Sequence, residues 1–351
     1  MGQKNNRQDT HLSGANSIPF TRAAILAPFI AYLESQGIPT QPYLHKAHIS
    51  ISLLNDPQAP LPLYFGYRFL ETVARTEGID NLGLKVGANT SLDDIGAFGH
   101  ILQQARTIYE YLQTGVQLIG SVTSGERFWL TDDGEDIRFN HYIPYINDFG
   151  RQQSDWFTLI ITINTIHKAT QGEWHPKQLH LASGFQGRFP LQKLLSETKI
   201  TKGGKISYFT LPRTVLKLPM PLLTIPTPPI DDSQHHFGSP HPLQFHEALQ
   251  TLIESLLTEG YPDLYLAAEA AGTSTRTLQR HLAESGLSYS KIVNTTRMRL
   301  ATRWLVNTEM SIKEIAVSLG YGDASNFTRA FRTQTGLSPK EYRYLQSHSS
   351  H

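Results

Sequence analysis

Two short segments in the last quarter of the chain carry the side chains best suited to chemistry. Each surrounds a pair of large apolar residues, and the remaining positions are Arg276, Thr277, Gln279, Arg280 and His281 in the first segment and Ser325, Asn326, Thr328, Arg329 and Arg332 in the second. Arginine can donate two hydrogen bonds to guanine, glutamine and asparagine can pair with adenine, and serine or threonine can bind bases or phosphates. Neither 275–282 nor 325–332 contains an acidic residue, so both are suited to a polyanion such as DNA.

These segments belong to an internal repeat. Before each of them, apolar residues recur at helical spacing and end at a glycine, over Leu264–Gly272 and, 48 residues later, over Ile312–Gly320. A helix, a tight turn with glycine and a second helix form the helix-turn-helix pattern, whose second helix enters the major groove. Ser274 is the expected N-cap of the first recognition helix, and Asp323 or Ser325 that of the second. The solvated faces of an ordinary helix pair would also give one such pattern, but two copies at a fixed offset favour DNA binding.

The segment between the two copies predicts a rigid connection. Residues 289–307 contain neither glycine nor proline and place apolar residues along a helical stripe. A helix of this length spans about 28 Å, which suits recognition helices set about 34 Å apart, one turn of DNA. Arg297, Arg299 and Arg303 on this helix are expected to contact phosphates.

The charge of the chain is divided unevenly. Residues 273–351 hold 11 basic and 5 acidic side chains, a net of +6, whereas residues 1–272 hold 20 basic and 25 acidic, a net of −5. This asymmetry also indicates a polyanionic partner for the C-terminal part. The sequence of 351 residues contains no cysteine, which excludes disulfides, thiolate nucleophiles and cysteine-bound zinc.

The first two thirds of the chain predict a mixed α+β domain. Asp133-Gly134 lies between two strand-like runs, 127–131 and 135–142, and an Asp-Gly pair is typical of a tight hairpin. Further strands are expected at 178–182 and 206–211. Helical spacing of apolar residues predicts helices at 20–33 (with Thr21 as N-cap), 64–75, 108–122 and 153–167.

This domain offers aromatic residues for a pocket but little for catalysis. The aromatic residues, with arginines nearby in sequence, are Phe128, Trp129, Tyr142, Tyr145, Phe149 and Trp156, beside Arg127 and Arg138. Large aromatic residues are mainly core residues, so the pocket residues stay unknown at this stage. The sequence has no Gly-x-Ser-x-Gly elbow, no His-Glu-x-x-His and no phosphate-binding glycine loop. We therefore expect no enzyme activity, no metal and no cofactor.

Residues 245–345 resemble the DNA-binding domain of the AraC/XylS family of bacterial transcription regulators. The resemblance rests on Arg276–Arg280 and on a signature that runs from Arg297-Met298 through Ala301, Leu305, Ile312, Ile315-Ala316, Leu319-Gly320-Tyr321, Phe327, Phe331 and Gly336 to Ser338-Pro339. The N-terminal part is similar to the arabinose-binding-like domain of some such regulators around 96–99, 174–176 and 218–222.

The outward positions and the resemblance together give an expected set of DNA contacts. The residues expected to contact bases are Arg276, Thr277, Gln279, Arg280, Ser325, Asn326 and Arg329. Those expected to contact the DNA backbone are Ser274, Arg297, Arg299, Arg303, Thr328, Arg332 and Lys340.

The resemblance also implies the organisation and partners of the chain. We expect a flexible arm at 1–19, an α+β effector-binding and dimerisation domain at 20–222, a proline-rich linker at 223–244, an all-α domain of two helix-turn-helix motifs at 245–345 and a tail at 346–351. The expected partners are double-stranded DNA, a small-molecule effector, a second copy of the chain and RNA polymerase, in a cytoplasmic transcription activator. Two alternatives stay open: a constitutive DNA-binding protein with a purely dimerising first domain, and a metabolic enzyme tethered to DNA.

Overall fold

The computed structural model describes residues 18–144, 148–183, 194–221, 245–257 and 262–348. The chain divides into two compact units, one within residues 19–241 and the other within residues 242–351. Residues 1–17 of the expected arm and all of the expected linker at 223–244 lie outside the described residues.

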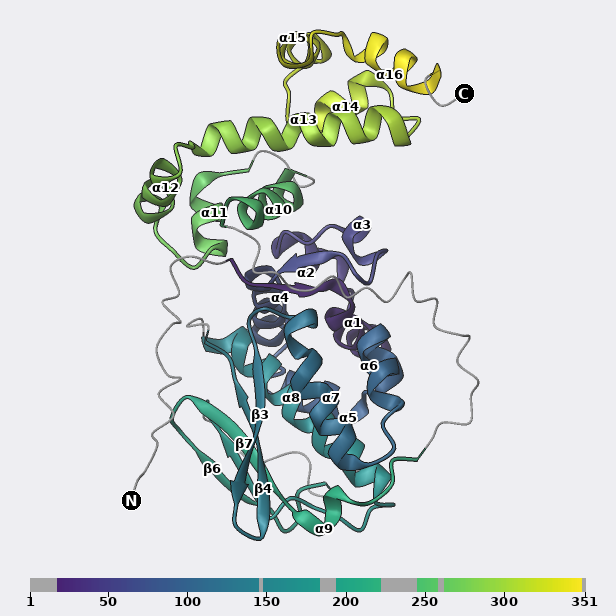
Figure 1. Ribbon diagram of the computed structural model, residues 1–351, viewed down its shortest axis with the longest axis vertical. Helices are drawn as coiled ribbons and strands as arrows, with labels where there is room; N and C mark the ends of the chain where they lie inside the picture. Colours follow the sequence, from purple (N-terminus) through teal and green to yellow (C-terminus); the bar gives the residue numbers. More distant parts are fainter. Residues whose placement is uncertain (1–17, 145–147, 184–193, 222–244, 258–261, 349–351) are drawn as a thin grey trace, which may run out of the picture. The chain divides into compact units, whose positions relative to one another are not determined.

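The N-terminal unit is an α+β structure (Figure 1). Its strands are β1 (Phe20–Arg22), β2 (Pro60–Pro62), β3 (Arg127–Asp133), β4 (Asp136–Tyr142), β5 (Gln178–Leu181), β6 (Lys199–Lys202) and β7 (Ile206–Pro212). Its α-helices are α1 (Ala27–Ser35), α2 (Gln41–Lys46), α3 (Ile51–Leu54), α4 (Leu63–Thr76), α5 (Leu82–Asn89), α6 (Gly96–Gln103), α7 (Ile108–Val122), α8 (Asp148–Ala169) and α9 (Arg213–Leu216). Two 3₁₀ turns, Ala23–Leu26 and Leu92–Ile95, precede α1 and α6.

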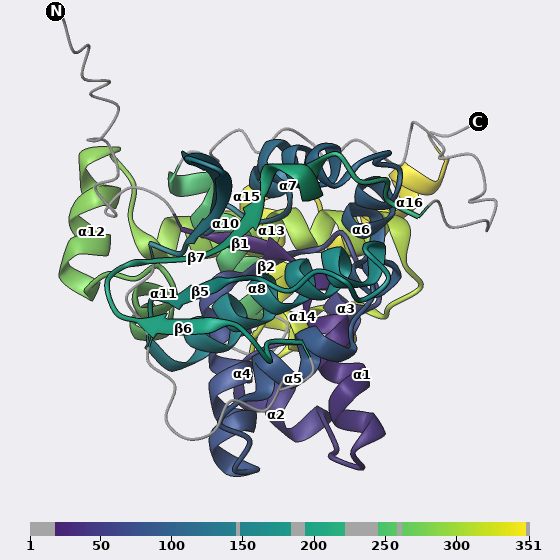
Figure 2. The ribbon, with the colours of Figure 1, turned by 90° about the horizontal axis from the view of Figure 1, so that it is seen from below.

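A five-stranded sheet of order β3-β4-β7-β5-β6 forms one side of this unit. Its pairs are antiparallel except for β5 and β6, and β6 lies at an edge (Figure 2). The predicted hairpin forms, but its turn lies one residue later than the Asp133-Gly134 pair indicated: β3 and β4 pair from Arg127 with Tyr142 to Asp133 with Asp136. The loop therefore consists of Gly134 and Glu135, and Gly134 has a φ of +75°, which suits the first loop position of a primed turn.

The helices of the N-terminal unit gather beside the sheet, with α5 and α8 in close contact. Gly83 and Gly87 lie one turn apart on α5 and face α8. A Cβ atom on Gly83 would lie 2.0 Å from the carbonyl oxygen of Gln153, so only glycine permits this approach. The fully buried Gln153 side chain accepts a hydrogen bond from the Gly83 amide at 2.8 Å and donates one to the carbonyl of Asp80.

The expected first helix, 20–33, is partly wrong. Residues 20–22 form β1, in which Thr21 pairs with Leu61, so Thr21 is buried in a sheet and caps no helix. The α-helix begins only at Ala27, and Pro28 occupies its first turn. Proline suits that position because it lacks the amide hydrogen that a helix interior would need.

The described part of the C-terminal unit consists of helices alone. They are α10 (Phe245–Leu257), α11 (Leu264–Ala270), α12 (Thr275–Glu284), α13 (Tyr289–Asn307), α14 (Ile312–Ser318), α15 (Ala324–Thr335) and α16 (Pro339–His348). The predicted fold class, an α+β domain followed by an all-helical domain with two helix-turn-helix motifs, is confirmed. The last helix continues to His348, into the segment that we expected to be a tail.

The helix α13 joins the two motifs. Its bounds, Tyr289–Asn307, are those predicted from the absence of glycine and proline. Figure 1 shows α11 and α12 near one end of α13, and α14 and α16 toward the other. Arg343 on α16 donates hydrogen bonds to the carbonyl oxygens of Leu305 and Met310, which fastens the second motif to the end of α13.

Candidate nucleic-acid interface

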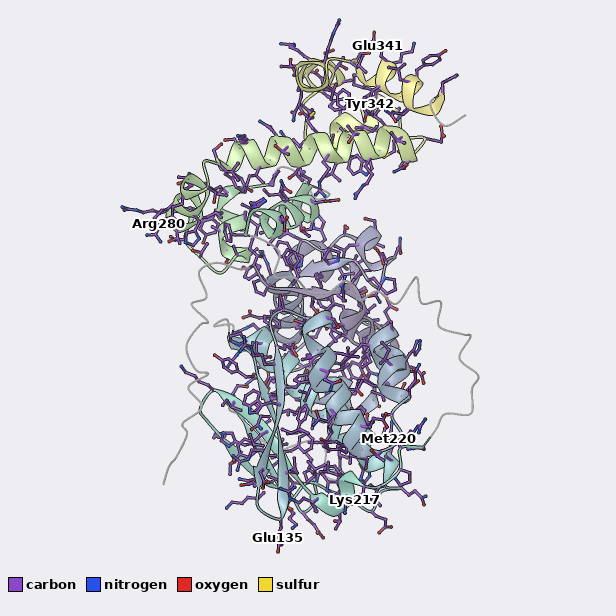
Figure 3. All side chains as sticks on the ribbon, in the orientation of Figure 1. Glu135, Lys217, Met220, Arg280, Glu341 and Tyr342 are labelled. Atoms are coloured by element: carbon purple, nitrogen blue, oxygen red, sulfur yellow. The ribbon has the colours of Figure 1, made fainter. Side chains whose placement is uncertain are left out.

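The first recognition helix, α12, is held by an N-cap and two apolar side chains. The predicted cap is confirmed: the Ser274 hydroxyl accepts a hydrogen bond from the Thr277 amide at 3.2 Å. Leu278 and Leu282 are buried, and the opposite side of the helix exposes Arg276, Gln279 and Arg280. Figure 3 shows Arg280 on the outer side of α12, where its Nε atom lies 3.7 Å from the Glu284 carboxylate. A pair this exposed holds arginine weakly, so Arg280 is available to an incoming base.

The second recognition helix, α15, orders its polar side chains through a chain of hydrogen bonds. Its N-cap is Asp323, which accepts from the Asn326 amide at 2.7 Å and from the Asn326 side chain at 2.8 Å. Arg329 in turn donates to the Asn326 side-chain oxygen at 3.4 Å. Ser325, Asn326 and Arg329 are exposed, and Phe327 and Phe331 are fully buried beneath them.

The two helices place equivalent residues outward. An offset of 49 residues relates the buried pairs, and the same offset relates Arg280 to Arg329 and Arg276 to Ser325. The capping residue differs, since a neutral Ser274 stands where the second motif has Asp323. Both recognition helices therefore present an arginine at the same turn, but only the second carries a carboxylate at its N-terminus.

Arg297, one of the expected backbone contacts, is engaged within the C-terminal unit. Its side chain is only 7% exposed, and its guanidinium carbon lies 5.0 Å from the centre of the Tyr321 ring. One of its nitrogens lies 3.5 Å from the carbonyl oxygen of Gly320. Arg297 therefore fastens α13 to the turn of the second motif, and its expected contact with a phosphate stays a prediction.

The other two arginines of α13 are engaged within the unit. Arg299 and Arg303 are about half exposed, and both bind the carboxylate of Glu254 on α10, at 2.5 and 2.7 Å. A phosphate would have to compete with this carboxylate for either of them. The Ser274 and Thr328 hydroxyls are likewise occupied by contacts in their own helices, whereas Arg332 and Lys340 are exposed.

Comparison with known proteins agrees with these motifs. Residues 37–220 match the model of the arabinose-binding domain of AraC transcription regulators, and residues 267–344 match a helix-turn-helix domain. The chain belongs to the AraC family of transcription regulators. This AraC-family protein is therefore a DNA-binding transcription regulator of the helix-turn-helix type.

Individual relatives differ in how much of the regulator they cover. The ornithine utilization regulator of Pseudomonas aeruginosa is 42% identical over 104 residues, which is 29% of this chain and 31% of that protein. An HTH-type transcriptional regulator of Mycobacterium tuberculosis is 22% identical over 321 residues, 88% of this chain and 92% of that protein. Among solved structures, the transcriptional regulator CdpR from Pseudomonas aeruginosa is 21% identical, with 92% of this chain and 98% of that chain covered and a TM-score of 0.41. No helix in the described part of the regulator is both long and apolar enough to cross a membrane.

The aromatic residues of the N-terminal unit divide between core and cavity. Trp156 is buried in the core, whereas Phe128 lines an internal cavity and meets the His141 ring edge-on. Arg138 stacks on the Tyr208 ring at 4.2 Å and binds Asp133. Tyr145 and the side chain of Phe149 lie outside the described residues.

Beside that cavity lies a buried charged cluster that the sequence analysis missed. His141 on β4 is fully buried, with Nδ1 2.8 Å from Asp155 on α8 and Nε2 3.1 Å from Glu126, which precedes β3. The Ser154 hydroxyl donates to Glu126, and the Ser207 hydroxyl on β7 donates to Asp155 at 2.6 Å. We call Glu126, His141 and Asp155 the buried triad. Their spacing along the chain follows no helical or strand period, so only the fold brings them together.

The triad is a buried group of charged side chains, and its geometry does not suit activation of a nucleophile. Burial by itself would lower the pKa of His141, but hydrogen bonds with Asp155 and Glu126 outweigh burial and raise the pKa to about 9. His141 is therefore protonated at neutral pH. Because a carboxylate faces each ring nitrogen, neither nitrogen is placed to accept a proton from a serine, as catalysis of the Ser-His-Asp type requires.

Proposed function

We propose that this regulator reads two successive major grooves along one side of DNA, one with α12 and the other with α15. The observation that carries the proposal is the pair of equivalent arginines, Arg280 and Arg329, on two recognition helices joined by α13. The 19 residues of α13 extend over about 28 Å, close to the distance of about 34 Å between successive major grooves on one face of DNA.

The proposed contacts follow from side-chain chemistry and exposure. Residues proposed to contact bases are Arg276, Thr277, Gln279, Arg280, Ser325, Asn326 and Arg329. Among the expected backbone contacts, Arg332 and Lys340 have the most accessible charges and are the first candidates for phosphates.

The experiment is a selection from random duplexes followed by footprinting. The full chain should enrich one sequence at moderate ionic strength, and hydroxyl-radical cleavage should show two protected stretches about one helical turn apart on the same face. Protection of only one of these two stretches would contradict reading by both helices. Equal retention of selected and random DNA would contradict sequence reading altogether.

We further propose that the N-terminal unit binds a small-molecule effector and that two chains associate on DNA. An effector can change DNA binding only if it prefers one arrangement of the protein over another. Two linked subunits would gain affinity through effective concentration. A panel of metabolites should therefore contain at least one that shifts both the melting temperature and the affinity for the selected site.

The alternatives predict different outcomes in the same assays. A constitutive DNA-binding protein with a dimerising first domain would bind the selected site equally with every metabolite. A DNA-tethered enzyme would consume one of them. Activation, and contact with RNA polymerase, would appear as increased transcription from a promoter that carries the selected site.

A further inference from the structure

The N-terminal unit contains an internal cavity between the helices and the sheet. Its walls come from the 3₁₀ turn before α6, from α6, α7 and α8, and from β3 and β4, with Phe98, Ile119, Phe128 and Phe157 among the apolar contributors. The cavity has a volume of about 60 Å³. This is room for about four water molecules. A ligand with a short aliphatic chain would take the place of these water molecules.

One carboxylate stands in this apolar wall. Glu126 is the one charged residue among the described residues that line the cavity. Its side chain is 8% exposed, and its two oxygens face the His141 ring and the Ser154 hydroxyl. Each carboxylate oxygen can accept a second hydrogen bond, so Glu126 keeps capacity for a ligand.

The charges of the three side chains in the buried triad do not sum to zero. One protonated His141 faces two carboxylates, which leaves a net charge of about −1 in a region with little access to water. A buried net charge is costly unless an opposite charge accompanies it. Asp155 is turned away from the cavity and is held by Ser207, so Glu126 is the member that can meet an incoming cation.

We propose that this cavity is the effector site and that it takes a small molecule with an apolar body and a positively charged amine, which pairs with Glu126. The inference rests on the proposed regulation by a small molecule and names the class of that molecule. An aliphatic body would displace water from the walls around Phe128 and Phe157, and the amine would neutralise the net charge of the triad. Binding would thereby tie α7 and α8 to the sheet more firmly.

The first experiment compares three four-carbon probes of similar size on the full chain. Butylammonium, butanol and butyrate share one four-carbon chain but carry a positive, neutral or negative end. Isothermal titration should give butylammonium at least tenfold tighter binding than butanol, with no measurable binding of butyrate. Equal binding of butylammonium and butanol, or preference for butyrate, would overturn the proposal.

Two matched variants locate the site. Glu126→Gln and Asp155→Asn each remove one negative charge from His141, but only Glu126 lines the cavity. Glu126→Gln should abolish the preference for butylammonium over butanol, whereas Asp155→Asn should retain at least a threefold preference. Loss of the preference in both variants to the same degree would assign it to the net charge of the triad and overturn a direct contact with Glu126.

A second pair of variants keeps the test valid if the Glu126→Gln variant does not fold. Gly115 lies in the cavity wall on α7, and a Cβ atom there would meet Leu102 at 3.8 Å, an ordinary contact. Gly120 on the same helix has open space around it. Gly115→Leu should fill the cavity and remove binding of both butylammonium and butanol, and Gly120→Leu should keep both. Binding that survives Gly115→Leu would overturn the cavity as the site.

Failure of the proposed ligand class can be distinguished from failure of the proposed regulation by an effector. If the amine probes fail but a neutral or acidic metabolite shifts DNA affinity, the class of ligand is wrong and regulation by an effector stands. If butylammonium binds as expected and no amine changes DNA affinity, the site exists and its regulatory role fails.

Discussion

The two units of this regulator use polar side chains in opposite environments. On α12 and α15, Arg280 and Arg329 are exposed and make few contacts with the rest of the protein. In the N-terminal unit, the side chains of Glu126, His141 and Asp155 are at most 8% exposed and are paired with one another. An exposed arginine is available to a partner at little cost to the stability of the fold. The members of the buried triad bind one another and so stabilise the N-terminal unit.

The difference predicts where mutations act. Removing an exposed side chain should change DNA affinity and leave the free energy of unfolding nearly unchanged. Removing a carboxylate of the buried triad leaves buried hydrogen-bond donors without an acceptor and should destabilise the unit. The following variants test this contrast in order of expected effect.

Asp155→Ala should have the largest effect. It leaves the Ser207 hydroxyl and Nδ1 of the fully buried His141 without an acceptor and should lower the free energy of unfolding of the N-terminal unit by about 2–5 kcal/mol. Urea unfolding followed by tryptophan fluorescence measures this, in a Trp304→Phe background so that the signal comes from Trp129, Trp156 and Trp174. Arg75→Ala, the matched exposed variant in the same unit, should change the same quantity by less than about 0.5 kcal/mol. A similar loss of unfolding free energy in both variants would contradict the difference between buried and exposed side chains.

The pH dependence of the N-terminal unit should follow the protonation of His141. Its pKa is raised from 6.5 to about 9 in the folded protein, so its stabilisation is fully present below pH 6.5 and is lost as the pH rises towards 9. The total loss should be about 3 kcal/mol. Urea midpoints at a series of pH values measure it, and His141→Gln should flatten the decline. An equal decline in that variant would place the titrating group elsewhere.

Arg280→Ala and Arg329→Ala should each weaken binding to the selected site by about 1–3 kcal/mol and relax preference at different base pairs. Fluorescence anisotropy with the selected site and its single-pair variants measures both effects. A loss that is uniform over all sequences would show that these arginines bind phosphates and do not read bases.

The smallest effect should come from the N-caps, where the two motifs differ. Asp323→Ser gives the second motif the cap of the first, removes a negative charge beside the DNA and should strengthen binding to all sequences by about 0.3–1 kcal/mol. It should also relax preference at the base read by Asn326, which loses its fastening to Asp323. Ser274→Asp is the converse control and should weaken binding to all sequences. A change of the same sign in both variants would contradict a direct charge effect.

The sequence predicts the C-terminal unit better than the N-terminal one for a physical reason. Helices with one buried face reveal themselves by periodicity, and α13 has the predicted bounds because Ser288 caps it and no glycine or proline interrupts it. The contact of Arg297 with Tyr321 and Gly320 could not be predicted, because these residues come from the turn of the second motif and a helical stripe in α13 carries no information about them.

The buried triad of the N-terminal unit could not be predicted from periodic patterns in the sequence. Glu126, His141, Asp155 and Ser207 come from separate elements and meet only because β4 and β7 pair and α8 packs against them. The helix α5 was likewise not predicted, since Gly83 and Gly87 weaken its helical signal and are required only by the approach of α8.

The most direct test of the central claim is the affinity of the full chain for its selected site before and after insertion of five base pairs between the two protected stretches. Half a helical turn moves one stretch to the opposite face of the duplex. Because α13 fixes the separation of the two recognition helices, we expect the insertion to weaken binding at least tenfold and to leave an Arg329→Ala variant much less affected. Unchanged affinity of the wild-type chain for the expanded site would contradict simultaneous reading by α12 and α15.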